Sequence, residues 1–160
     1  MTKNKNACFK KRRSHAMSNL NIIAGAVIGT SAMTGFSYGV ANLTQQQFRE
    51  PELLNKLISP TVPEPVQSTA YGWIIHYGVG LGFMFTYHQV WTRNRTNTLL
   101  KNTLVLGLAS GILGASVWAA VLKLHPHAPS VNVKRFLPHL IAAHIVFAFF
   151  AKRGYKNCRA

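Results

Sequence analysis

The chain is short of acidic residues. Its 160 residues include no Asp, and the only Glu residues are Glu50, Glu52 and Glu64, against 18 Lys and Arg. Charged residues make up 13% of the chain, about half of the roughly 25% that is usual in a soluble domain. The sequence shows no paired carboxylates within an apolar stretch, no Ser-His-acid set and no P-loop. We therefore expect a protein that is not an enzyme.

Cysteine is also scarce. The two cysteines, Cys8 and Cys158, lie near opposite ends of the chain and belong to no CxxC or zinc-type spacing. Both fall on the side that we expect to be cytoplasmic, where thiols stay reduced. The sequence therefore predicts free thiols.

The excess of positive charge gives a formal net charge of +15. Such a charge is typical of nucleic-acid-binding proteins, but there the basic residues line one helix face or alternate with stacking aromatics. Here they stand in short groups at the ends of apolar stretches. We therefore expect no nucleic-acid partner.

Four long apolar stretches are what the chain does have. They are Leu20–Ala41, Ala70–Trp91, Leu99–Leu122 and Phe136–Ala151. The first three contain 22, 22 and 24 residues, and a helix needs about 20 apolar residues to cross a bilayer. The fourth contains 16 and reaches spanning length if it begins near Val133. These lengths predict an all-α, polytopic membrane protein with four transmembrane helices in one domain, residues 18–152, and basic cytoplasmic tails at 1–17 and 153–160.

The distribution of Lys and Arg predicts the orientation. The N-terminal tail has six, the loop after the second stretch three and the C-terminal tail four, which places 13 on one side and leaves five on the other. All three Glu residues lie on the poorer side. The positive-inside rule then places both termini in the cytoplasm. We favour a retained first helix over a cleaved signal peptide, because its apolar stretch is longer than a signal peptide requires.

The longest loop, Gln45–Thr69, divides into two parts. Leu53, Leu54, Leu57 and Ile58 have the spacing of a short amphipathic helix lying on the outer interface. The proline-rich segment SPTVPEPVQS after it predicts an extended chain. This loop is a connector packed on the bundle, or a lid or partner-docking segment.

Small residues four apart predict helix packing, because close backbone approach drives association in lipid. The short loop TRNRTNT predicts a hairpin of the second and third helices. We favour a tight bundle over a substrate passage. The packing glycines predicted from this spacing are Gly25, Gly29, Gly35, Gly39, Gly107, Gly111 and Gly114.

Two of the seven histidines, His76 and His144, lie inside apolar stretches at similar predicted depths, about 9 and 12 Å below the outer ends of their helices. Ionisable residues within a membrane are candidates for function. Three interpretations stay open: a hydrogen bond between helices, a proton-linked role, or a cofactor site. As a cofactor site, His76 and His144 would ligate haem b, or would bind Zn or Cu together with His139, or with His125 and His127.

The segments GTSAMTGFSY at 29–38, FREPELL at 48–54 and PHLIAAHIVF at 138–147 resemble the YagU-like family, with His76, Tyr87 and His144 as the marker residues. These are small, uncharacterised bacterial inner-membrane proteins. The resemblance implies a four-helix membrane fold, a bacterial inner (plasma) membrane location, and the two histidines as family features. It implies no reaction.

The interpretation that we favour is a non-catalytic structural or partner-binding component of the membrane. A haem- or metal-binding protein and a small transporter or channel acting as an oligomer are the alternatives. The expected partners are the lipid bilayer, a second copy or another membrane protein, and anionic lipid at the basic segment KNKNACFKKRR.

Overall fold

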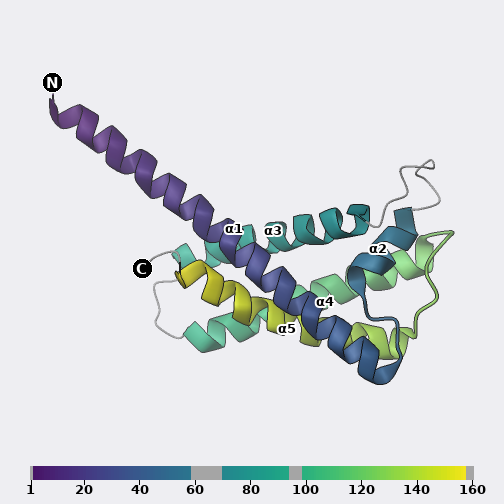
Figure 1. Ribbon diagram of the computed structural model, residues 1–160. Helices are drawn as coiled ribbons and strands as arrows, with labels where there is room; N and C mark the ends of the chain where they lie inside the picture. The colour runs from purple at the N-terminus through teal and green to yellow at the C-terminus, as the bar shows by residue number, and fades with distance from the viewer. Residues whose placement is uncertain (1, 59–69, 94–98, 158–160) are drawn as a thin grey trace.

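The computed structural model describes the backbone of residues 2–58, 70–93 and 99–157, and the side chains of residues 19–58, 70–93 and 101–155. This part of the chain is all-helical. The helices are α1 (Thr2–Thr44), α2 (Glu50–Ile58), α3 (Ala70–Arg93), α4 (Leu99–Leu124) and α5 (Val133–Asn157), as Figure 1 shows. Both cysteines and the proline-rich segment 59–69 lie outside the described side chains.

Within the described residues, three helical segments are long and apolar enough to cross a membrane: Asn19–Thr44, Lys101–Leu124 and Val133–Tyr155. The sequence predicts four. Helix α3 has the necessary length, 24 residues, but is not among the three, because its tyrosines, His76, His88 and Gln89 dilute its apolar residues. Helix α5 begins at Val133 and has 25 residues, so the fourth apolar stretch reaches a spanning length.

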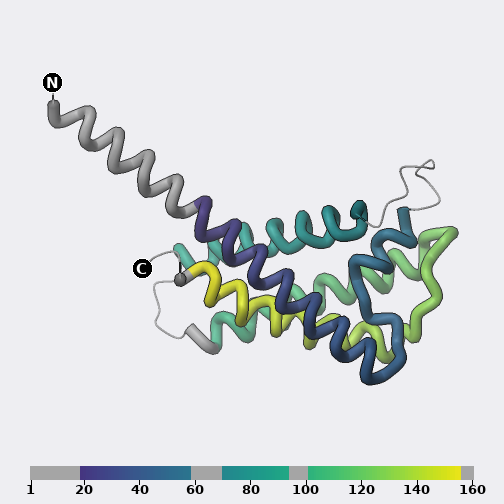
Figure 2. The backbone as a smooth tube through the Cα atoms, viewed as in Figure 1, coloured from purple at the N-terminus to yellow at the C-terminus, as the bar shows by residue number. Residues whose placement is uncertain are grey.

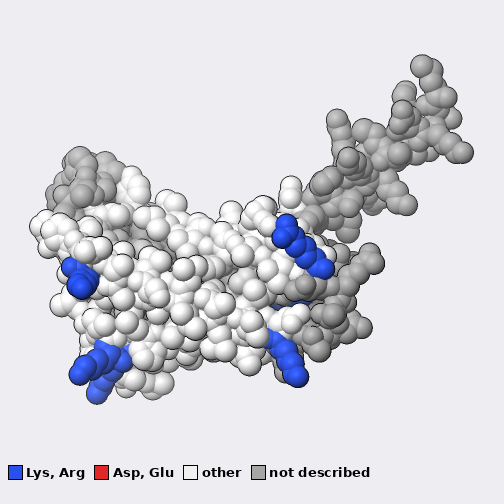
Figure 3. Space-filling model, turned by 180° about the vertical axis from the view of Figure 1, so that it is seen from behind, with Lys and Arg blue, Asp and Glu red and all other residues white. Residues whose placement is uncertain are grey.

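The surface of the bundle is apolar and its interior holds polar groups. Large apolar side chains are exposed along α3 and α4, among them Ile74, Phe85, Val105 and Ile112. On the face shown in Figure 3, Lys and Arg appear only near the two ends, with an uncharged area between them. A water-soluble bundle would bury its apolar stripe, so this arrangement is that of helices that face lipid. The buried polar and charged residues are Asn21, Thr30, Thr34, Ser37, Glu50, His76, Thr103, Ser110, His139 and His144.

Helices α1 and α5 form the antiparallel centre of the bundle. A Cβ at Gly29 would lie 2.8 Å from Ala151 Cβ, and a Cβ at Gly154 would lie 2.8 Å from the backbone oxygen of Ala24. Such contacts leave no room for a side chain and allow the two backbones to approach closely. Helix α3 packs on α1 and helix α4 packs on α5, an order that can be followed in Figure 2.

Glycines also form the contact between α4 and α5. A Cβ at Gly107 would lie 2.9 Å from Ile145 Cα, and one at Gly111 would lie 2.8 Å from Ile141 Cα. On α3, Gly72 abuts the carbonyl of Pro51 and Gly80 abuts the hydroxyl of Thr30. These two close approaches are not among the glycine contacts predicted from the sequence.

Gly35 and Gly39, two of the predicted packing glycines, make no close contact in the described part of the chain. A Cβ at either position would have no atom of the described residues within 4 Å. At 100° per residue, Gly35 lies about 240° around the helix from Gly29. The packed face of α1 continues instead through Met33 and Ser37, which are buried.

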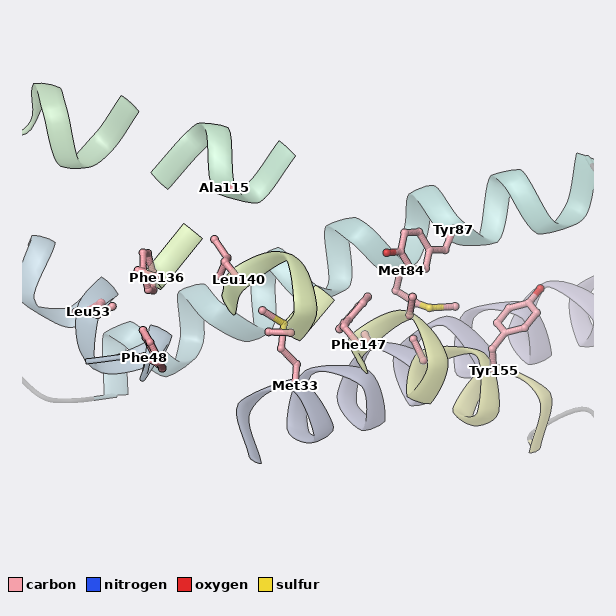
Figure 4. Packing of buried hydrophobic residues seen from close by; sticks show 14 of the residues in the cluster. Met33, Phe48, Leu53, Met84, Tyr87, Ala115, Phe136, Leu140, Phe147 and Tyr155 are labelled. Atoms are coloured by element: carbon pink, nitrogen blue, oxygen red, sulfur yellow. The ribbon is translucent and has the colours of Figure 1, made fainter. Parts of the chain in front are cut away.

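The apolar core runs along the bundle, as Figure 4 shows. It extends from Leu53 of α2 and Phe136 of α5 at one end to Tyr155 of α5 at the other. Helices α3 and α4, the predicted hairpin, do not pack closely along their length. Tyr87 bridges the space between them: its hydroxyl lies 2.6 Å from Ser110 Oγ and donates to the carbonyl of Leu106 at 3.1 Å. A large side chain, rather than a close backbone contact, therefore sets the separation of α3 and α4.

Candidate functional site

A cavity of about 270 Å³ lies between α3 and α4. Residues of α1, α5 and α2 complete its wall. All five helices contribute to its wall, which is almost entirely apolar. The lining residues are Thr30 and Met33 of α1; Glu50, Leu54 and Leu57 of α2; His76, Val79, Gly80 and Phe83 of α3; Leu113, Gly114, Val117, Trp118 and Val121 of α4; and Leu140, His144 and Phe147 of α5.

The mouth of the cavity is apolar. Val79 of α3 and Leu113 and Val117 of α4 line the cavity, yet they are also 50%, 56% and 54% exposed on the outer surface. The opening therefore lies between α3 and α4, in the part of the surface where exposed apolar side chains are concentrated. Such an opening admits molecules from an apolar surrounding more readily than from water.

Glu50 is the one acidic residue of the cavity wall and is only 2% exposed. Ser37 donates a hydrogen bond to Glu50 Oε1 at 2.7 Å, whereas Oε2 has no partner among the described residues. Burial raises the pKa of the Glu50 carboxyl from 4.5 to about 7, against the opposing effects of the Ser37 hydroxyl and of its own backbone N–H. A carboxyl in this setting is readily held in its neutral form.

Ser37 also joins Glu50 to His139. The Nε2 atom of His139 lies 3.0 Å from Ser37 Oγ and 3.9 Å from Glu50 Oε1, and its ring stacks between those of Phe36 and Phe48 at centroid distances of 5.4 and 4.3 Å. Since Ser37 gives its one hydrogen to Glu50, His139 must donate to Ser37. The Nε2 atom of His139, which faces Ser37, then has no lone pair with which to deprotonate it, and Ser37 is fully buried. The cluster is not a nucleophilic triad.

The hydrogen bonds of His76 determine which ring nitrogen carries the proton. Thr34 Oγ1 donates to the carbonyl of Thr30 at 2.8 Å and lies 2.9 Å from His76 Nε2. The hydroxyl has only one hydrogen, so it accepts from Nε2–H. The Nδ1 atom of neutral His76 therefore carries a lone pair, and no hydrogen bond of the described residues occupies it.

His144 has the opposite tautomer. Its Nδ1 lies 2.8 Å from the carbonyl oxygen of Leu140, which can only accept, so Nδ1 is the donor. Its Nε2 then carries the lone pair, close to the surface of α4 at Gly114. The ring is held by an edge-on contact with Phe83, at a centroid distance of 5.3 Å. The cavity thus contains two imidazoles, each fixed by one nitrogen.

The structure brings together one of the two predicted histidine groups. His76 and His144 line the same cavity. The other three predicted ligands do not line this cavity: His125 and His127 contact each other in the loop before α5, and His139 is buried against Ser37. The described residues contain no group of three or more His, Cys, Asp or Glu side chains that could hold a metal ion.

Glu50 is the site residue that the sequence analysis missed. It was assigned to an outer loop, although it stands three, four and seven positions before Leu53, Leu54 and Leu57. That spacing places a residue on the same face of a helix. A carboxylate on the apolar face of a short helix was therefore the available signal.

No family model, no curated protein and no solved structure matches this chain.

Proposed function

We propose that this chain is a four-span protein of the bacterial inner membrane, with both termini in the cytoplasm, which binds a small amphiphile from the bilayer and does not transform it. The observation that carries the proposal is the cavity between α3 and α4, because its mouth consists of lipid-facing apolar side chains. At about 270 Å³, the cavity is near the lower end of the roughly 300–1,000 Å³ typical of ligand sites.

Three features support α3 as the fourth span. It has 24 residues, and its outward side chains, such as Ile74, Val79 and Phe85, are apolar. It runs antiparallel to α1, as the pairs Thr34–His76 and Gly25–Met84 show. Four alternating spans return both termini to one side, which agrees with the excess of Lys and Arg in the two tails.

A binding role is favoured over catalysis because the polar groups are engaged in structural bonds. Ser37 is buried and hydrogen-bonded to Glu50, and His76 and His144 each use one nitrogen to hold a neighbouring helix or turn. An organic ligand is favoured over haem, because a porphyrin is far larger than the cavity. It is favoured over Zn or Cu because the described residues supply no third ligand.

Photolabelling of the full chain in bilayers, with a single-chain lipid that carries a diazirine on its chain, tests the proposal. We expect saturable labelling of Met33, which is buried in the cavity wall. Val117→Trp should abolish it by filling the mouth. Ile112→Trp is the matched control: both residues are exposed positions of α4, 54% and 57%, but Ile112 does not line the cavity. Labelling confined to lipid-facing residues, without saturation, would refute a ligand site.

A further inference from the structure

The polar atoms of the cavity restrict the chemistry of its ligand. The cavity wall includes two histidines and Glu50, but no Lys or Arg. His76 Nδ1 and His144 Nε2 both carry lone pairs, since the other nitrogen of each ring is the donor in a protein hydrogen bond. The wall also contains the hydroxyl of Thr30, which has no hydrogen-bond partner among the described residues and can donate or accept. The polar groups of the wall are therefore two imidazole acceptors, this hydroxyl and one carboxyl, without a compensating positive charge.

An anionic head group is disfavoured in such a site. A carboxylate or phosphate would lose its hydration without gaining a cation. It would also face the lone pairs of the two imidazoles, and the ionised form of Glu50 would repel it.

A cationic head group is disfavoured for a different reason. An ammonium ion would find acceptors, but it would be transferred into an almost entirely apolar wall with one carboxyl group as its counter-ion. Desolvation of both charges then opposes the attraction between them.

An uncharged hydroxyl meets neither penalty. It donates one hydrogen bond to an imidazole lone pair, and its oxygen can accept another. The space of about 270 Å³ corresponds to on the order of ten non-hydrogen atoms, at roughly 30 Å³ for each water-sized group. One head and the first part of one chain fit that space, whereas a two-chain phospholipid does not.

We propose that the cavity binds a single-chain amphiphile with an uncharged hydroxyl head, such as a long-chain alcohol or an alkyl phenol. The hydroxyl donates to His76 Nδ1 or His144 Nε2, and the chain leaves between Val79 and Val117 into the bilayer. This inference rests on the proposed function, because it names the ligand class of the same cavity.

Competition with a matched series of compounds tests the inference. Dodecanol, dodecylamine and dodecanoic acid would compete against a diazirine-bearing long-chain alcohol for labelling of the full chain at Met33. We expect half-maximal competition by the alcohol at a concentration at least tenfold lower than that of the amine or the acid. Equal or better competition by the amine or the acid would overturn the hydroxyl assignment and leave a ligand site in place. Failure of every probe to label saturably would instead refute the proposed function itself.

Two substitutions separate the acceptor nitrogens from their structural partners. In His76→Gln the amide nitrogen replaces Nε2 and keeps the bond to Thr34, and in His144→Asn it replaces Nδ1 and keeps the bond to Leu140. Both remove the ring nitrogen assigned to the ligand. His139→Gln is the control, because His139 lies outside the cavity wall. We expect the preference for the alcohol to fall at least fivefold in one or both cavity variants and to persist in the control. An unchanged preference in both folded variants would contradict the assignment, and the competition series decides the matter if they do not fold.

Discussion

Ser37 of α1 donates a hydrogen bond to Glu50 of α2 at 2.7 Å, and both side chains are buried. This bond connects a membrane-length helix to the short helix that closes one end of the cavity. The carboxyl group that it holds titrates within the physiological range, because burial raises the pKa of Glu50 to about 7.

The contribution of Glu50 to stability should decrease as the pH rises. The native state holds the Glu50 proton up to about pH 7, whereas the unfolded chain releases it near 4.5. Between these values the native state holds the Glu50 proton more tightly than the unfolded chain, so the part of the free energy of unfolding due to Glu50 falls with increasing pH, by at most about 3–4 kcal/mol at roughly 1.4 kcal/mol per unit. Thermal unfolding in detergent from pH 4.5 to 8 measures this.

The same titration of Glu50→Gln provides the control, because the amide keeps the acceptor for Ser37 and cannot ionise. The variant should lose most of the decrease between pH 4.5 and 7. Among the described residues, His139 is the one titratable group in ion-pair contact with Glu50, and its Nε2 atom lies 3.9 Å from Glu50 Oε1. An identical pH dependence in the variant would assign the decrease to another group.

Glycine contacts should differ sharply in their sensitivity to substitution. Gly111→Val would place its Cβ 2.8 Å from Ile141 Cα, and overpacking of this kind costs roughly 1–3 kcal/mol. Gly35→Val, with no atom within 4 Å of its Cβ, should leave the free energy of unfolding within about 0.5 kcal/mol. Unfolding by SDS titration compares them. Equal destabilisation would show that α1 packs through Gly35 in the membrane.

Removal of the Tyr87 hydroxyl should loosen α3 from α4. Tyr87→Phe keeps the aromatic contacts with Phe147 and Trp91 but loses the bonds to Ser110 and to the carbonyl of Leu106. We expect a loss of about 1–2 kcal/mol in the free energy of unfolding. Tyr77→Phe, which loses only an exposed bond to Ser31, is the comparison. A larger effect at Tyr77 would place the stronger constraint between α1 and α3.

The fourth span can be tested by cysteine accessibility in a variant without Cys8 and Cys158. Lys56 lies before α3 and Lys101 lies in the first turn of α4. If α3 crosses the membrane, a membrane-impermeant maleimide added outside intact cells labels Lys56→Cys and spares Lys101→Cys until the cells are permeabilised. Labelling of both in intact cells would mean that α3 does not span.

The sequence predicted the helices better than the site. The apolar stretches anticipated α1, α3, α4 and α5, because length and apolarity are local properties. Spacing alone could not show which glycine pair of α1 faces a neighbouring helix. The pairs Gly25/Gly29 and Gly35/Gly39 have the same four-residue spacing, but only the first makes close contacts among the described residues. That choice depends on the rotation of α1 against α5.

The surroundings of the histidines and of Glu50 likewise depend on contacts between helices, which local sequence does not give. Similar depths in two helices made His76 and His144 candidates for one site, and both line the cavity. His139 was assigned to an outer metal site, but aromatic rings from α1 and from the segment before α2 bury it. Glu50 faces the cavity because α2 folds back onto α3, with Pro51 against Gly72. The spacing of Glu50 from Leu53, Leu54 and Leu57 gives its helix face, but the contact of α2 with α3 is long-range and has no local signature.

Native mass spectrometry of the full chain, released from its own membranes, tests the central claim most directly. The account predicts one single-chain amphiphile bound per protein in the wild type and in Ile112→Trp, and its loss in Val117→Trp. A wild-type protein without such an adduct, or an adduct that Val117→Trp retains in full, would contradict the assignment of the cavity between α3 and α4 as a ligand site.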